Sequence, residues 1–138
     1  MKLVSIFLFL TILVLKSSSD SPDKWTQFAE EIEAEITAQI KRKDWKGLTS
    51  QFSEDFVYEK CFGQRFNRHS TVYELLLQPA SENNYRVVQS AVNINDDEFY
   101  YILDEKIFSQ IVRTSNTVKN VDGQWLFTNK QEYDCREY

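Results

Sequence analysis

Tyrosines and carboxylates are the side chains of this sequence with the best supply for proton-transfer chemistry. A carboxylate that faces a cavity can accept a proton, and a tyrosine hydroxyl opposite it can stabilise the oxyanion that forms. Two tyrosines from segments with strand-forming composition could line such a cavity. The tyrosines in or near such segments are Tyr58, Tyr73, Tyr85, Tyr100, Tyr101 and Tyr133.

Many aromatic rings of this chain must nevertheless be structural. The sequence has ten phenylalanines, seven tyrosines and three tryptophans, and a buried tyrosine usually finds a hydrogen-bond partner in the core. We take Tyr58, Tyr101 and Trp125 as candidate pocket-lining residues. A place in the core is the simpler interpretation for each of them.

Other candidates for catalysis are few. The only histidine, His69, precedes a predicted helix, and we expect it in a cap or loop rather than as a base. The acidic clusters at residues 96–98 and 104–105 are expected in solvated turns. The sequence has no HExxH zinc motif, phosphate-binding loop, nucleophile elbow or dinucleotide fingerprint. We therefore assign no catalytic residue, metal or cofactor.

Arg65 and Arg68 flank Phe66 at the start of that helix, where exposed backbone N–H groups favour an anion. A small anion-binding patch is one interpretation, and a pair of surface arginines that balance an acidic protein is the other. The chain carries 16 Lys and Arg against 21 Asp and Glu, a net charge of −5. Such a balance argues against nucleic acid and anionic membranes as partners, since both are bound mainly through basic patches.

The first 19 residues have the composition of an export signal. Lys2 is followed by an apolar run over residues 3–15, and Ser17 and Ser19 have the spacing that signal peptidase recognises. The apolar run is too short to cross a hydrocarbon core as a helix. We expect cleavage after Ser19 and a secreted, extracellular domain of residues 20–138 that has no membrane contact after cleavage.

Both cysteines, Cys61 and Cys135, lie in the expected mature chain. An even number of cysteines in an exported protein usually forms disulfides, so we predict a bridge between them. Two buried free thiols are the alternative. A zinc site is not expected, because two cysteines and one histidine do not make a usual set of four ligands.

Helical periodicity dominates the first half of the expected domain. A helix is predicted over residues 21–43, where apolar residues recur every three or four positions after a Ser-Pro start signal. The glutamates between them, Glu33 included, predict an acidic face in contact with water. Asp44 is predicted to cap a second, short helix, and a third helix is predicted to begin at residue 70 or 71.

Segments rich in β-branched and aromatic residues follow. One strand is predicted over residues 56–61, and an Asp-Gly pair at 122–123 is a strong hairpin signal because glycine supplies the positive φ of a tight turn. Alternation along residues 124–133 places Trp125 on a core side and Lys130 on a mostly wet side. The other strands are predicted over residues 86–94, 99–103 and 107–118.

Helices followed by long antiparallel strands make an α+β protein in which a curved sheet wraps around its helices. The Lys-Asp-Trp-Lys-Gly-Leu segment at 43–48, the segment at 52–58 and the hairpin at 122–127 resemble the nuclear-transport-factor-2-like superfamily. This superfamily of cone-like α+β barrels includes ketosteroid isomerase, scytalone dehydratase and SnoaL-like cyclases. The signal and the cysteine pair look most like its small secreted branch in nematodes. The resemblance implies that the first and last strands are neighbours, which would bring Cys61 and Cys135 to the same edge of the sheet.

Our leading functional hypothesis is a secreted, non-enzymatic domain that binds a small apolar ligand in the cone or pairs through its sheet face. Tyr100 and Ile102 alternate with Phe99, Tyr101 and Leu103, so both faces of that strand are apolar. An open sheet with an apolar outer face needs a cover, and a homodimer would supply it.

Two other classes of function stay open. A lyase or isomerase that acts by proton transfer on a small carbonyl compound would need an inward carboxylate beside a tyrosine. A cystatin-like protease inhibitor would also combine a helix, antiparallel strands and a disulfide. The sequence lacks the Q-x-V-x-G loop of cystatins and predicts more helices than they have.

Overall fold

The computed structural model describes residues 23–78, 84–107 and 110–135. The predicted export signal and its cleavage site lie outside these ranges. No helix within them is long and apolar enough to cross a membrane.

Helix α2 (Lys24–Arg42) begins later than the Ser-Pro signal predicted, because Asp23 is its N-cap and accepts a hydrogen bond from an amide of the first turn. Its buried face contains Ala29 and Ile36. Glu33 lies between these residues at helical spacing and is only 4% exposed. The prediction that Glu33 belongs to a water-facing acidic side was therefore wrong.

Two shorter helices follow along the chain. Asp44 caps α3 (Trp45–Ser50), as the sequence predicted. Helix α4 (Arg68–Leu76) begins two or three residues earlier than predicted, after the N-cap Asn67. His69 therefore lies in the first turn of a helix instead of in a cap or loop.

The six strands form one sheet in the order β2-β1-β6-β5-β4-β3. Neighbouring strands are antiparallel except β1 and β6, which run parallel. The α+β fold is confirmed, but the sheet is mixed and does not close into a barrel. The strands are β1 (Phe52–Glu59), β2 (Arg65–Asn67), β3 (Tyr85–Asn95), β4 (Glu98–Ile107), β5 (Gln110–Val121) and β6 (Gln124–Tyr133).

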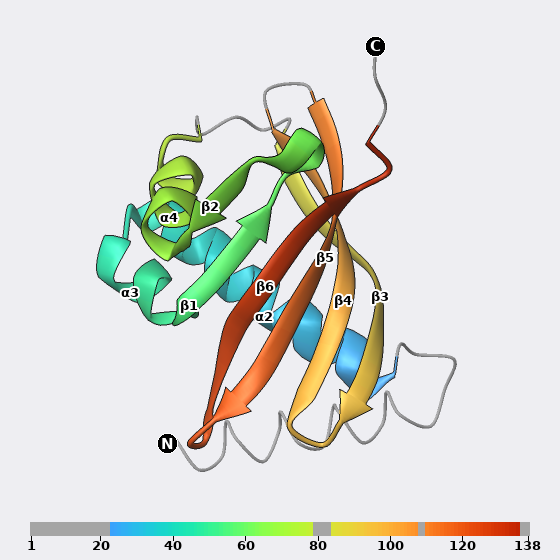
Figure 1. Cartoon of the computed structure of the whole chain (residues 1–138). Coiled ribbons are helices and arrows are strands. Elements are labelled where there is room, and N and C mark those ends of the chain that lie inside the picture. The colour runs from blue at the N-terminus through green and yellow to red at the C-terminus, as the bar shows by residue number, and fades with distance from the viewer. Residues whose placement is uncertain (1–22, 79–83, 108–109, 136–138) are drawn as a thin grey trace.

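The core lies between α2 and the face of the curved sheet that it crosses (Figure 1). Trp25 and Phe28 of α2 meet Phe99 of β4 and Trp125 of β6, with ring centroids 5.0–6.4 Å apart. Full burial of a phenylalanine such as Phe99 stabilises a fold by about 1.5–3 kcal/mol, and the other three rings are partly buried against it. These four rings therefore hold the N-terminal helix against both halves of the sheet.

A β-bulge in β6 moves the residues after it to the faces of the sheet opposite to those predicted. Val118 pairs with Phe127, but Thr117 pairs with Asn129, so Thr128 is an extra residue on β6. The alternation of side chains shifts at this point. Lys130 consequently points into the core and is 5% exposed, although the sequence predicted it on the wet side.

The acidic cluster at 104–105 does not form a turn, contrary to our prediction. Strand β4 continues to Ile107, and Glu105 is buried on its inner face. Asp104 lies on the opposite face, where Arg113 of β5 donates two hydrogen bonds to its carboxylate. Side-chain pairing across strands, and not a turn, accounts for both acids.

Candidate functional site

The interior of the cone holds a cluster of charged and polar side chains from four elements. We call it the buried charged cluster. It consists of Glu33 from α2, Arg86 from β3, Tyr101 and Glu105 from β4, and Lys130 from β6. These residues had no common signal in the sequence, because they come from distant segments and three of them, Glu33, Glu105 and Lys130, were expected in water.

Each charge of the buried charged cluster is paired. The Tyr101 hydroxyl donates to Glu33 Oε1 at 2.5 Å, and Arg86 Nε donates to Glu33 Oε2 at 2.6 Å. Arg86 Nη1 lies 2.7 Å from Glu105 Oε1 as an ion pair. Lys130 Nζ donates to the same oxygen of Glu105 at 2.7 Å. Two carboxylates and two cations therefore compensate one another inside the core.

The surroundings determine the protonation of Tyr101 and Glu105. Burial, and then the negative charge of Glu33, raise the pKa of Tyr101 well above its ordinary value. Burial alone would raise the pKa of Glu105, but Lys130 and Arg86 outweigh it and the pKa is lowered. Glu105 is thus a stabilised carboxylate with little tendency to accept a proton, and Tyr101 is a hydrogen-bond donor.

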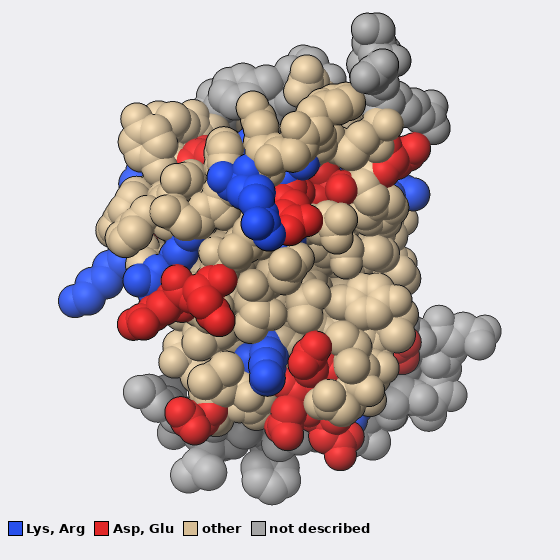
Figure 2. Space-filling view, in the orientation of Figure 1, with Lys and Arg blue, Asp and Glu red and all other residues tan. Residues whose placement is uncertain are grey.

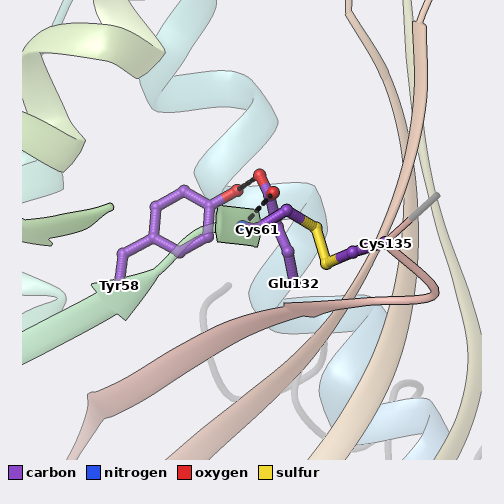
Figure 3. Close-up of a disulfide and its surroundings, with 4 residues drawn as sticks. All are labelled: Tyr58, Cys61, Glu132 and Cys135. Atoms are coloured by element: carbon purple, nitrogen blue, oxygen red, sulfur yellow. Dashed lines mark hydrogen bonds between the residues drawn. A yellow bond between two sulfur atoms is a disulfide. The ribbon is translucent and has the colours of Figure 1, made fainter. Parts of the chain in front are cut away.

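A second interior pair connects the core to the disulfide (Figure 3). The Tyr58 hydroxyl donates to Glu132 Oε1 at 2.6 Å, and the Cys61 amide donates to Glu132 Oε2 at 3.0 Å. Cys61 and Cys135 are bonded, which confirms the predicted bridge. Burial, and then Glu105, raise the pKa of Tyr58, so its hydroxyl stays protonated.

Lys60, which directly follows β1, connects this strand to α4. Its Nζ donates to both carboxylate oxygens of Glu74, at 2.8 and 2.7 Å. The same ammonium lies 4.2 Å from the ring centroid of Phe66 and 5.4 Å from that of Tyr58. Lys60 is 19% exposed at its side chain, so this bridge is partly shielded from water.

The other notable site is on the outside, between α3, β2 and α4. We call it the aromatic groove. Trp45, Tyr73 and Leu77 are 42%, 59% and 59% exposed there. The Trp45 and His69 rings are nearly parallel, at 19°. The groove has a volume of about 550 Å³ and is lined by Trp45, Phe66, His69, Ser70, Tyr73, Glu74 and Leu77.

Hydrogen bonds at the α2–α3 turn hold the elements that form the aromatic groove. Asp44 Oδ1 accepts a hydrogen bond from the Gly47 amide, and a side chain at Gly47 would collide with the Asp44 carboxylate. Lys43 Nζ donates to the Leu76 carbonyl at 2.7 Å and so ties the end of α4 to the α2–α3 turn. The groove is therefore a preformed surface rather than one that must be assembled on binding.

The structure does not bring the candidate site residues together in one pocket. Tyr58 and Tyr101 are buried and bonded to glutamates, and Trp125 belongs to the ring cluster of the core. Arg65 pairs with Glu59 on the surface at 2.7 Å, and Arg68 is the first residue of α4. Within the described residues, no three His, Cys, Asp or Glu side chains are arranged to hold a metal ion.

A family model described as NTF2-like domain matches residues 26–136 of the chain. Among curated proteins, none matches the chain. Solved structures with the same fold include an NTF2-like protein of unknown function from Silicibacter pomeroyi, at a TM-score of 0.65 and 13% identity. That match covers 77% of this chain and 91% of the bacterial one.

Two further solved structures extend this comparison. An NTF2-like protein from Cytophaga hutchinsonii matches at a TM-score of 0.61 and 13% identity, over 80% of this chain and 98% of its own. A de novo designed protein with a curved β-sheet matches at a TM-score of 0.58 and 16% identity, over 75% of this chain and 98% of its own. At such identities the likeness concerns the fold alone.

Proposed function

The chain belongs to the NTF2-like domain family, and from this premise we propose that it is a secreted, non-enzymatic domain that binds a small apolar ligand. The observation that carries the proposal is the contrast between a paired interior and an exposed groove. Carboxylates and tyrosines of the described interior bond to one another or to cations, while the rings of the aromatic groove remain open to solvent.

The aromatic groove has the features of a small-molecule site. Its volume of about 550 Å³ falls in the usual range of ligand pockets, roughly 300–1,000 Å³. Apolar and aromatic side chains line it, and His69, Ser70 and Glu74 supply polar groups that can orient a ligand. Because Trp45 and Tyr73 expose aromatic rings in the groove, a flat ring compound is the ligand that fits best.

The proposal is tested with 2-naphthol as a flat, mainly apolar probe, by titration calorimetry and by the shift in tryptophan fluorescence. We expect Tyr73→Ser to weaken binding at least tenfold, because it removes a ring that is 59% exposed and has little role in the core. Phe62→Ser is the matched control, since Phe62 is an exposed aromatic residue outside the groove. Equal binding by Tyr73→Ser and the unchanged protein would contradict this assignment.

Secretion is part of the same proposal. The Cys61–Cys135 bridge is consistent with an oxidising compartment, where disulfides persist. Expression of the full chain in a eukaryotic host tests the point. The proposal requires protein in the medium whose mass corresponds to cleavage after Ser19 and to an oxidised cysteine pair.

We also propose a homodimer through the outer face of the sheet. Val92 of β3 is 45% exposed and pairs with Tyr100, and Ile102 lies on the same face of β4. Figure 2 shows a broad uncharged surface over the strands, between two groups of charged side chains. Sedimentation at tens of micromolar should give a dimer, and Ile102→Lys should give a monomer. A monomer in the unchanged protein would refute this part.

Proton-transfer catalysis is the alternative, and the Tyr101–Glu33 hydrogen bond is the observation in its favour. It is the inward carboxylate beside a tyrosine that such a reaction needs. A test is deuterium exchange at the carbon next to the carbonyl of cyclohexenone, with Tyr101→Phe as the variant. Exchange that is faster than in buffer and lost in Tyr101→Phe would favour the enzyme over the binding domain.

A further inference from the structure

Among the described residues, strand β3 has a strand partner on only one side of its backbone. It is the last strand in the order β2-β1-β6-β5-β4-β3, and it has 11 residues. Backbone N–H and C=O groups on such a side can pair with an additional strand. Natural edge strands are commonly protected by lysine, proline or bulges, and the sequence of β3 contains neither lysine nor proline.

The bulges of β3 divide it into two regular stretches. Its register against β4 shifts between Val88 and Ser90, and again between Asn93 and Asn95. The first stretch, Tyr85 to Val88, pairs without interruption with β4. Arg86, the one charged residue of the strand, points inward to Glu33, so it does not shield this edge. The first four residues of β3 therefore form a regular edge that carries no outward charge.

A groove of about 440 Å³ lies beside this stretch, between α2 and β3. Its α2 wall includes the exposed residues Glu30 and Ala34, and its β3 wall includes Val87, which is 46% exposed. A strand edge with a groove and a helix alongside is a geometry in which an extended peptide adds as a further strand, with its side chains in the groove.

The charge of the α2–β3 groove favours one kind of occupant over another. Glu30 makes no ion pair with the described residues, and Glu31 is exposed on the adjacent turn surface. A second copy of this chain, with a net charge of −5, would bring more negative charge to this side. A segment with alternating apolar and basic residues would place its apolar side chains beside Val87 on the outer face of the sheet and its cations on the α2 side, near Glu30.

We propose that the edge of β3 at residues 85–88, together with the α2–β3 groove, binds an extended basic segment of a partner protein by β-strand addition. This site is separate from the aromatic groove and does not depend on the proposed ligand. It needs no rearrangement of the sheet, because the edge and the groove are already formed.

The test uses a fluorescein-labelled decapeptide of alternating valine and lysine, with its valine–glutamate counterpart as the comparison. Fluorescence anisotropy with the purified full chain should show binding of the basic peptide only. Amide hydrogen exchange should slow at residues 85–88 when that peptide is present. Binding of both peptides alike, or protection elsewhere, would overturn the proposal.

Two matched pairs of variants localise the effect. Glu30→Lys should weaken binding about fivefold or more by reversing a charge that faces the peptide, whereas Glu31→Lys, outside the groove, should change it less than twofold. Val87→Lys should also weaken binding, whereas Ile94→Lys, similarly exposed but beyond the first bulge, should not. Equal effects within either pair would refute the site. Protection of residues 85–88 that rises with protein concentration alone would assign the edge to a second copy instead.

Discussion

The buried charged cluster and the aromatic groove both reverse the usual distribution of side chains in a globular domain, in which charges face water and large rings are buried. The interior holds two carboxylates and two cations, whereas the exterior holds a tryptophan, a tyrosine and a leucine in contact with water. The interior carboxylates and cations form ion pairs with one another. The groove rings have no comparable cover within the described chain, and this difference is why we look for a ligand there. The comparison teaches that chemically reactive residue types are poor guides to a site when every one of them is already bonded.

The largest effect is expected from Glu105, whose carboxylate compensates both Lys130 and Arg86. Glu105→Gln leaves two buried cations underpaired and should destabilise the fold by about 3–5 kcal/mol. Urea unfolding measures the loss. Asp104→Asn is the matched control, because it breaks a neighbouring pair with an exposed arginine and should cost about 1 kcal/mol or less. Equal losses would mean that the interior pairs are no more important than surface ones.

Removal of the disulfide is expected to have the next largest effect. The bridge joins residues 74 positions apart, and loss of such a bridge typically costs about 2–5 kcal/mol. The double variant Cys61→Ser, Cys135→Ser should lower the thermal midpoint accordingly. The aromatic groove should still bind its probe at temperatures where this variant is folded, because the bridge lies outside it. Loss of binding in the folded variant would link the two regions.

Acid should weaken the interior by protonating Glu105. In the folded protein the pKa of Glu105 lies below its ordinary value of 4.5, because Lys130 and Arg86 outweigh the effect of burial. Its contribution to stability is therefore present above the unfolded value and is lost as the pH falls through the lowered folded value. The difference in unfolding free energy between the unchanged protein and Glu105→Gln should be large at pH 7 and should shrink below about pH 4. A pH-independent difference would show that Glu105 acts through packing alone.

The smallest effect on stability is expected in the groove itself. Tyr73→Ser should change the free energy of unfolding by about 0.5 kcal/mol or less, because the ring is 59% exposed. The same variant is expected to lose probe binding. A loss of several kcal/mol in urea unfolding would make Tyr73 a structural residue and remove the contrast between the two regions.

Local signals predicted the fold well where turn chemistry was explicit. The bounds of β6 agree with the prediction over residues 124–133, since Asp122 and Gly123 take the positive φ of a tight turn. The cap at Asp44 and the bridge of the two cysteines were also predictable from residue type and position. Each of these features depends on neighbouring residues or on the cysteine count.

The buried charged cluster depended on long-range geometry. Lys130 could not be placed because the extra residue Thr128 reverses the alternation of β6, and no residue type marks that bulge. Glu105 was assigned to a turn because acidic runs are common there. Glu33 did carry a signal, since it lies four residues after Ala29 and three before Ile36 on the buried face of α2. His69, Tyr73 and Leu77 recur at spacings of four along the chain, but the sequence does not show whether such a row is buried or open.

The parallel pairing of β1 with β6 has a consequence for how the chain acquires its structure. These strands meet through residues about seventy positions apart, such as Val57 and Asn129. Closing so long a loop is entropically costly, and folds with many distant contacts form slowly. During synthesis, β1 must wait for nearly the whole chain to emerge before it finds its neighbour. The hairpins of β3 to β6 have only local partners to find, so we expect them to form first and to act as the template on which β1 and its helices dock.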